Sequence, residues 1–166
     1  TNGIPNDHFV RVVREDPNRE GLLYAGTEFG MYISLDHGAN WQTFQLNLPV
    51  TPITDMLIKE KDLVIATQGR SFWILDDLSP LYEMNQELVG KSIHVFEPRT
   101  AYRTQMRGFF RGSGAPERPP FGALLYYYLE EKPGKDDTLK LDIMDARGNT
   151  VTTYSTHPDK SKKENS

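Results

Sequence analysis

The chain has 166 residues, 37% of them hydrophobic, 11% aromatic and 25% charged, which is typical of a globular chain and excludes a disordered or membrane-spanning one. The net charge of -4 gives no electrostatic reason to expect nucleic acid or an anionic membrane as a partner. The absence of cysteine excludes disulfides and thiolate metal sites, and it is compatible with the cytosol, the periplasm and the extracellular space alike. The sequence does not begin with Met and contains no targeting signal, so we expect it to be a segment of a longer protein.

The first 76 residues predict an all-β fold, because short runs of alternating or β-favouring residues are separated by Gly, Pro, Asn and Asp. The predicted strands are residues 8–13, 22–27, 30–35, 41–46, 53–58, 63–68 and 71–76. A helix of one or two turns is expected within residues 76–90. Asp77 or Ser79 is its expected N-cap, and Pro80 fits its first turn.

An internal repeat organises these strands. Shifting the chain by 40 residues aligns residues 23–36 with residues 63–76. The coinciding pairs are Leu23 with Leu63, Thr27 with Thr67, Leu35 with Leu75, Asp36 with Asp76 and, as aromatics, Tyr32 with Phe72. A period of about 40 residues filled by four short strands is typical of one β-propeller blade.

The sequence therefore predicts two consecutive four-stranded blades, residues 8–46 and 53–96, in a domain that covers residues 1–96. Two blades without the rest of their ring would leave apolar faces uncovered. The residues expected on these faces are Tyr32, Ile33, Phe72 and Trp73.

Residues 97–120 are predicted to form a basic linker rich in Gly and Pro. Its arginines are Arg99, Arg103, Arg107, Arg111 and Arg118. A four-residue spacing favours a basic binding helix, but Gly108, Gly112 and Gly114 disfavour a stable helix. Nucleic-acid binding is accordingly a weak alternative, and the linker is expected to keep its arginines in solvent.

Residues 121–156 predict a meander of three strands, 121–129, 138–145 and 150–156, which would begin a β-sandwich. The polar, charged residues 157–166 predict a disordered tail.

The octapeptide SLDHGANW, residues 34–41, is the most distinctive motif and is expected to be a structural hairpin loop. The motif begins at Ser34. Asp36 can accept hydrogen bonds from backbone N–H groups, Gly38 can take a positive φ, and the Trp41 ring can fold under the turn. A calcium loop would need more oxygen ligands, and a catalytic Asp36 would need a second carboxylate.

The pattern Ser-x-Asp-x-Gly-x-x-Trp resembles the Asp box, or bacterial neuraminidase repeat (BNR), which in that family is a structural hairpin. Residues 8–104 resemble the closing blades of mostly bacterial, secreted propeller proteins described as sortilin-like or glycosyl hydrolase-like. Residues 121–156 are similar to the immunoglobulin-like sandwich that follows the propeller in that family. The resemblance implies an extracellular or periplasmic location, with the missing blades of the parent chain as partners.

Blade topology predicts that ligand-contacting residues lie in the loops 27–30 and 67–71 and in the crossover 47–52, at the end opposite the Asp box. The candidates are Glu28, Gln68, Arg70 and Asn47. Each is also compatible with an ordinary solvated hairpin position. No metal site or cofactor is expected, since the four His residues lack metal-ligand spacing.

Carbohydrate or peptide binding is the function that the resemblance favours. The alternative is a sialidase-like or xyloglucanase-like glycoside hydrolase whose catalytic pair lies mostly outside this segment, and a third class is a structural assembly module. Catalytic residues are not assigned, because Glu28 is the only acid expected near the ligand end and a glycosidase needs two carboxylates. Fold alone does not decide between these functions.

Overall fold

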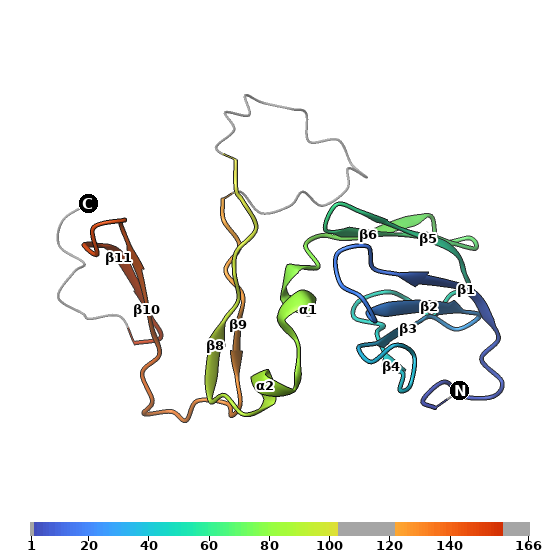
Figure 1. Cartoon of the computed structure of the whole chain (residues 1–166), viewed down its shortest axis with the longest axis horizontal. Coiled ribbons are helices and arrows are strands. Elements are labelled where there is room, and N and C mark those ends of the chain that lie inside the picture. Colours follow the sequence, from blue (N-terminus) through green and yellow to red (C-terminus); the bar gives the residue numbers. More distant parts are fainter. Residues whose placement is uncertain (1, 103–121, 158–166) are drawn as a thin grey trace. The chain divides into compact units, whose positions relative to one another are not determined.

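The computed structural model describes residues 2–102 and 122–157, and it is built mostly of short antiparallel strands (Figure 1). The predicted mostly β character is confirmed. The chain divides into two units, Thr1–Tyr128 and Leu129–Ser166. No helix within the described ranges is long and apolar enough to cross a membrane.

The first sheet is a four-stranded antiparallel meander in the order β1-β2-β3-β4. Its strands are β1 (Val10–Glu15), β2 (Leu23–Thr27), β3 (Met31–Ser34) and β4 (Gln42–Thr43). All four lie within or next to the predicted strands. Neighbouring strands pair because tight hairpins join them, and apolar residues on alternate positions give each strand a face to bury.

The second sheet is a three-stranded antiparallel meander in the order β5-β6-β7. Its strands are β5 (Ile53–Lys59), β6 (Asp62–Thr67) and β7 (Phe72–Leu75). The prediction of a fourth strand here is wrong for the described residues. Asp77 takes φ 65°, and a helix begins at Ser79 with Pro80 in its first turn, so the chain turns away instead of returning along β7.

The two sheets repeat the same local features. Each has an irregularity near the start of its first strand, between Val10 and Val12 in one and between Ile53 and Asp55 in the other. In each sheet the hairpin after the second strand begins with a threonine whose hydroxyl donates a hydrogen bond within the loop. Thr27 donates to the Gly30 carbonyl at 3.0 Å, and Thr67 donates to the Ser71 carbonyl at 2.6 Å.

The repeat shifts by one residue at this hairpin. Ala25 pairs with Tyr32, whereas Ile65 pairs with Trp73, so Tyr32 corresponds to Trp73 and not to Phe72. The β6–β7 loop is one residue longer, because Thr67 closes onto Ser71 where Thr27 closes onto Gly30. The predicted match of Asp36 with Asp76 shifts in the same way, to Asp77.

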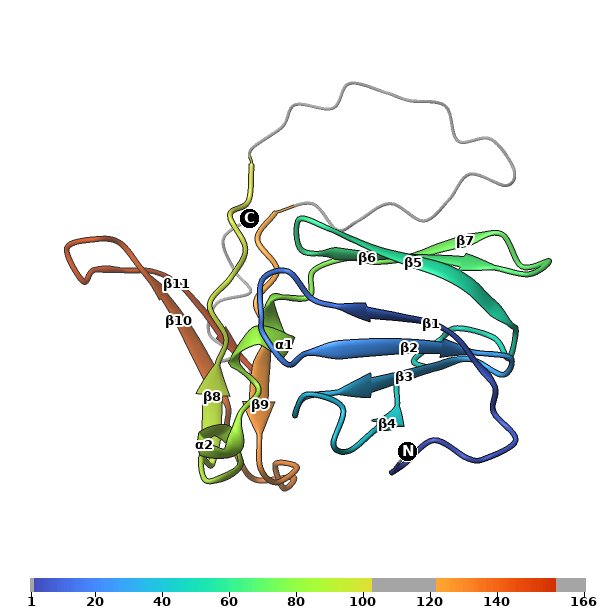
Figure 2. The ribbon, with the colours of Figure 1, turned by 45° about the vertical axis from the view of Figure 1, so that its right-hand side comes forward.

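The main hydrophobic core lies between the two sheets, which Figure 2 shows stacked on each other. Its buried members are Val12, Leu22, Tyr24, Met31, Ile33, Leu48, Ile53, Met56, Leu63, Ile65 and Leu78. The sheets approach most tightly at Gly26, where a Cβ would lie 2.6 Å from Ile53 Cγ2 and 2.9 Å from Val12 Cγ1. A side chain at this position would push the sheets apart.

The outer faces of the two sheets differ. On the first sheet Tyr32 is buried beneath Ile4 and Trp41, and Ile33 is buried in the main core, so the expectation that both are uncovered is wrong. The reason is that the N-terminal segment folds back over the sheet, with the Trp41 N–H donating to the Asn2 carbonyl. On the second sheet Phe72 is 73% exposed.

Two short helices follow the second sheet, α1 (Ser79–Glu83) and α2 (Gln86–Val89). The N-cap of α1 is Leu78, so neither Asp77 nor Ser79 caps it, although the Asp77 carboxylate accepts from the Ser79 N–H at 3.1 Å. Pro80 lies in the first turn, as predicted.

The predicted three-stranded meander of residues 121–156 does not form among the described residues. β9 (Tyr127–Leu129) instead pairs with β8 (Ile93–Val95), and the Phe96 N–H donates to the Tyr126 carbonyl at 3.0 Å. β10 (Lys140–Met144) and β11 (Thr150–Ser155) form a separate hairpin in the second unit. The prediction is wrong because the backbone of β9 pairs with β8, a strand distant in sequence, and not with the next strand along the chain.

Gly26→Ala tests the close approach of the sheets. We expect it to lower the free energy of unfolding by about 1–3 kcal/mol, since the new methyl overlaps Ile53 and Val12. The measurement is the midpoint of urea unfolding. Gly90→Ala is the matched control, because φ there is -90 and the nearest atom to its Cβ would be 3.9 Å away. Equal midpoints for the two variants would contradict the tight approach.

Candidate functional site

Three connections of the two sheets gather at one end, which we call the loop end: residues 27–30, 47–52 and 67–71. Alternate connections of an antiparallel meander lie at the same end of the sheet. Hydrogen bonds join these segments to their neighbours, from the Glu28 N–H to the Phe9 carbonyl at 3.2 Å and from the Gln68 N–H to the Pro52 carbonyl at 2.9 Å. In Figure 2 the hairpins β2–β3 and β6–β7 both turn at the right-hand side of their sheets.

The four predicted ligand-contacting residues all lie at this end, but they differ in exposure and in their partners. Gln68 and Arg70 lie at the tip of the β6–β7 hairpin with exposed side chains, and Asn47 is exposed in the crossover. Glu28 forms an ion pair with Arg11, with Oε1 2.6 Å from Nη2 and 2.8 Å from Nε. Neither of the two cavities described below is lined by Glu28, Gln68 or Arg70.

A hollow of about 380 Å³ opens beside the β2–β3 hairpin. It is lined by His8, Phe29, Gly30, Met31, Tyr32, Thr43, Gln45 and Val50. Two of the predicted ligand-end segments, the β2–β3 hairpin and the crossover, therefore contribute to it. The predicted side chains themselves are not in the lining; Asn47 instead borders a much smaller cavity of about 40 Å³ beside β7.

Aromatic rings form one wall of this hollow. The His8 and Phe29 ring centroids are 4.5 Å apart with an interplanar angle of 32°, and His8 meets Tyr32 edge to face at 5.9 Å. The Tyr32 hydroxyl and His8 Nδ1 form a hydrogen bond of 2.7 Å. Tyr32 is buried, whereas Phe29 is 45% exposed, so the phenylalanine ring is the part of this wall open to a ligand.

Gln45 also lines the hollow and is held in place by hydrogen bonds to the backbone. Its Oε1 accepts from the Met31 N–H at 3.2 Å, and its Nε2 donates to the carbonyls of Leu48 and Pro49 at 2.8 and 3.0 Å. Gly30 has φ 143, and a Cβ there would lie 1.9 Å from Gln45 Oε1. Glycine at position 30 therefore lets the glutamine amide reach the backbone.

Sequence reasoning missed the residues of this hollow. His8 is interpreted from the sequence only as a possible metal ligand, and Tyr32 only as a repeated aromatic on an apolar face, because the pairing of β1 with β2 that brings His8 beside Phe29 is not visible in the local sequence. The sequence did carry one signal, the glycine that directly follows Phe29 in the TEFG loop.

The octapeptide of residues 34–41, which resembles an Asp box and is called the Asp box below, lies at the other end of the first sheet, where the His37 N–H donates to the Gly21 carbonyl at 3.0 Å. Asp36 accepts from the Asn40 N–H at 2.8 Å, the Asn40 amide at 2.7 Å and the Ser34 hydroxyl at 2.8 Å. Gly38 has φ 84, and its carbonyl accepts from the Trp41 ring N–H at 3.1 Å. The polar groups of the box thus bond to one another.

The hairpin of the second unit uses the same arrangement. Asp145 accepts from the Asn149 N–H at 2.9 Å and from the Asn149 amide at 3.0 Å, four residues on as in the Asp box. Hydrogen bonds from the asparagine are the main reason that the pKa values of Asp36 and Asp145 are both lowered. In both units, therefore, an aspartate and the asparagine four residues later stabilise a hairpin loop by hydrogen bonding to each other.

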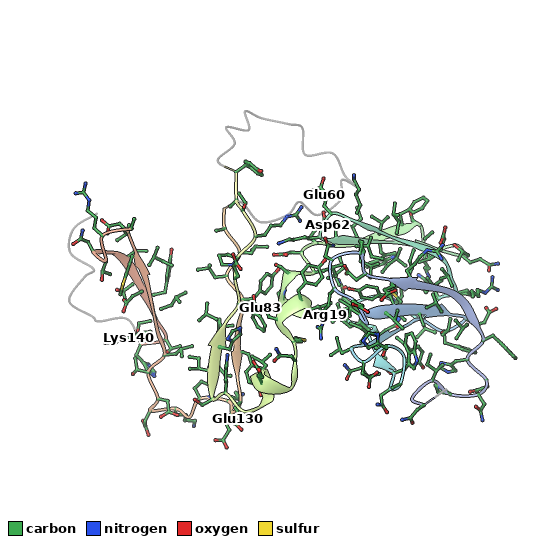
Figure 3. The ribbon with its side chains drawn as sticks, in the orientation of Figure 1. Arg19, Glu60, Asp62, Glu83, Glu130 and Lys140 are labelled. Carbon is green, nitrogen blue, oxygen red and sulfur yellow. The ribbon has the colours of Figure 1, made fainter. Side chains whose placement is uncertain are left out.

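A second polar cluster lies near α1, where Figure 3 labels Arg19, Asp62 and Glu83. Arg19 donates to the carbonyls of Leu81 and Met84 in and after α1, and Glu83 accepts from His94 and from the Glu97 N–H, each at 2.8 Å. These bonds tie the β1–β2 loop and β8 to the helix.

The buried part of this cluster centres on Asp16, which is 2% exposed. Its carboxylate accepts from the Tyr24 hydroxyl at 3.1 Å and the Asn18 N–H at 2.9 Å. Burial, reinforced by Asp16, raises the pKa of Tyr24 and raises that of Tyr82 to about 12. Because these groups satisfy each other, we assign the cluster a structural role.

No group of three or more His, Asp or Glu side chains in residues 2–102 and 122–157 is arranged to hold a metal ion. Of the linker arginines, Arg99 is described: it contacts Asp62 at 2.6 Å and Glu60 at 3.5 Å, and so is not freely solvated. The others, and the tail from residue 158, lie outside the described residues.

Asp36→Asn tests the loop role of the Asp box through pH. The pKa of Asp36 in the folded chain lies below its ordinary value of 3.8. The ionised carboxylate therefore stabilises the fold above pH 3.8, and this stabilisation is lost as the pH falls through the folded pKa. We therefore expect Asp36→Asn to lower the urea midpoint at pH 7 and to differ less from the parent chain at about pH 2.5. Tryptophan fluorescence measures it, because Trp41 and Trp73 both lie in the first unit.

Asp145→Asn is the matched control for this experiment. It removes the equivalent aspartate–asparagine hydrogen bonds from the second unit, so the urea midpoint measured by tryptophan fluorescence should not change. A pH-independent effect of Asp36→Asn, or an equal effect of Asp145→Asn, would contradict the assignment.

Comparisons with known proteins give no relative from which a function can be transferred. No family model matches the chain, and neither a curated protein nor a solved structure matches it.

Proposed function

We propose that the two sheets are consecutive blades of a β-propeller of the Asp-box kind and that their loop end recognises a ligand without cleaving it. The proposal starts from the repeat. Both sheets are meanders with an irregularity in the first strand and a threonine-led hairpin after the second. One of them carries the Asp box in its next hairpin.

The way the sheets stack supports this architecture. Trp73 packs on the core between the sheets, whereas Tyr32, its equivalent, lies on the far side of the first sheet. The front of one sheet thus meets the back of the other, an arrangement that can continue around a ring. Ile33 is covered by the second sheet, and its equivalent Ile74 is 60% exposed, which is where a further blade would pack.

The ion pair of Glu28 is the observation that favours ligand recognition over hydrolysis. The only acid expected near the ligand end is bonded to Arg11, and no carboxylate lines the hollow. A glycosidase needs two carboxylates flanking the scissile bond. The hollow instead offers aromatic and hydroxyl-bearing side chains, which are typical of a binding site.

Carbohydrate is the ligand class that this geometry favours over peptide. An extended peptide gains affinity by pairing with free backbone groups. Along the wall of the hollow these groups are already used: the Met31 N–H donates to Gln45, the Met31 carbonyl accepts from Phe44, and the Gly30 carbonyl accepts from Thr27. Ring stacking and hydroxyl contacts remain available.

An extracellular or periplasmic location, the immunoglobulin-like assignment of residues 121–156 and the presence of further blades in the parent protein belong to the same proposal. A preceding blade would border the Tyr32 face, so the hollow would lie at the seam between blades. The eight residues that line the hollow all belong to the chain described here.

The experiment measures binding and hydrolysis of plant and microbial polysaccharides by the chain, beside Glu28→Gln, Arg70→Ala and Phe29→Ala. We expect binding without cleavage, weakened about tenfold or more in Phe29→Ala, because that ring is the exposed wall of the hollow. Glu28→Gln should change binding little.

Two results would contradict the proposal. Cleavage that disappears in Glu28→Gln while binding persists would make the loop end part of a glycosidase site. Binding of peptides but of no polysaccharide would show that the ligand class is peptide and not carbohydrate. Unfolding midpoints of the three variants serve as the control that each one is folded.

A further inference from the structure

We infer that the hollow beside the β2–β3 hairpin takes an uncharged sugar ring, which stacks on Phe29 and hydrogen-bonds to His8 and Tyr32. This inference rests on the proposed recognition function and names the ligand more narrowly. It depends on three properties of the lining: a ring face, hydrogen-bonding groups and the absence of charge.

Phe29 supplies the ring face. It is 45% exposed, and His8 supports it from one side, with ring centroids 4.5 Å apart. The C–H face of a pyranose is apolar and flat, so it can cover an exposed aromatic ring while its hydroxyls point away. Gly30, the next residue, lets Gln45 approach the backbone of this hairpin, because any side chain at position 30 would collide with Gln45.

His8, Tyr32 and Thr43 supply the hydrogen-bonding groups. When the Tyr32 hydroxyl donates to His8 Nδ1, the imidazole proton lies on Nε2. Among the described residues, neither that Nε2 nor the Thr43 hydroxyl has a hydrogen-bond partner. A donor and a hydroxyl near an apolar ring face match the alternating hydroxyls of a sugar, whereas an aromatic peptide side chain would use only the apolar wall.

Charge decides which sugars fit. None of the eight lining residues carries a formal charge when His8 is neutral. The charged groups of the adjoining hairpin, Arg11 and Glu28, lie 2.6 Å apart and neutralise each other. A uronic or sialic acid would lose hydration of its carboxylate here without gaining a cationic partner. Neutral hexose and pentose rings carry no such cost.

The test is titration calorimetry of the chain with neutral oligosaccharides, unsubstituted cello-, xylo- and manno-oligomers, and with uronic- and sialic-acid oligomers of equal length. We expect at least one neutral series to bind about tenfold or more tighter than every acidic one. Phe29→Ala should abolish most of that binding. Tyr32→Phe, which keeps the ring and removes the hydroxyl, should weaken it about threefold or more.

Phe9→Ala is the matched control, since Phe9 is 70% exposed next to the same hairpin but does not line the hollow. Unchanged binding in this variant, with the loss in Phe29→Ala, supports the assignment. Equal loss in both variants would overturn it in favour of a diffuse apolar surface, and retained binding in Phe29→Ala would place the ligand elsewhere.

The outcomes separate this inference from the function on which it rests. Tighter binding of acidic sugars would overturn the inference while leaving sugar recognition in place. Absence of binding to any sugar, in a chain that unfolds cooperatively, would overturn both. Salt dependence adds a readout: neutral-sugar affinity should be unchanged between low and high salt, because no charge is paired on binding.

Discussion

The close contact of the two sheets at Gly26 is the constraint on which the rest of the first unit depends. Because residue 26 lacks a side chain, Ile53 and Val12 meet across it, and the main core closes between the sheets. That contact fixes the second sheet against the back of the first. It also sets the three connections of the loop end beside one another, since the crossover 47–52 must travel from the edge of one sheet to the first strand of the next.

The two ends of the stacked sheets have different chemistry. Near α1, Asp16, Arg19 and Glu83 bond to other residues of the protein, and they hold the helix and the β1–β2 loop in place. In the hollow beside the β2–β3 hairpin, Phe29 and Thr43 remain accessible. Polar groups that satisfy one another stabilise a fold, whereas accessible groups arranged around a hollow can meet a ligand.

Local pattern was sufficient to find the strands but not their partners. Alternation and turn residues located all seven strands of the first 76 residues, and the Asp box had the loop bonds that its residue types allow. The pairing of β9 with β8 joins residues separated by the whole linker, and no local signal specifies it. The one-residue shift between Tyr32 and Trp73 likewise depends on hairpin length, which an ungapped alignment hides.

The sequence by itself determined the mostly β character, the positions of the strands and the internal repeat, because these depend on residue propensity and on spacing along the chain. It also indicated the segments of the loop end. Only the tertiary structure decided that Glu28 is occupied by Arg11 and that His8, Phe29 and Tyr32 surround a hollow. Those contacts depend on the antiparallel pairing of β1 with β2, which places residues 8–11 beside the β2–β3 hairpin. No local pattern specifies which strands pair with each other.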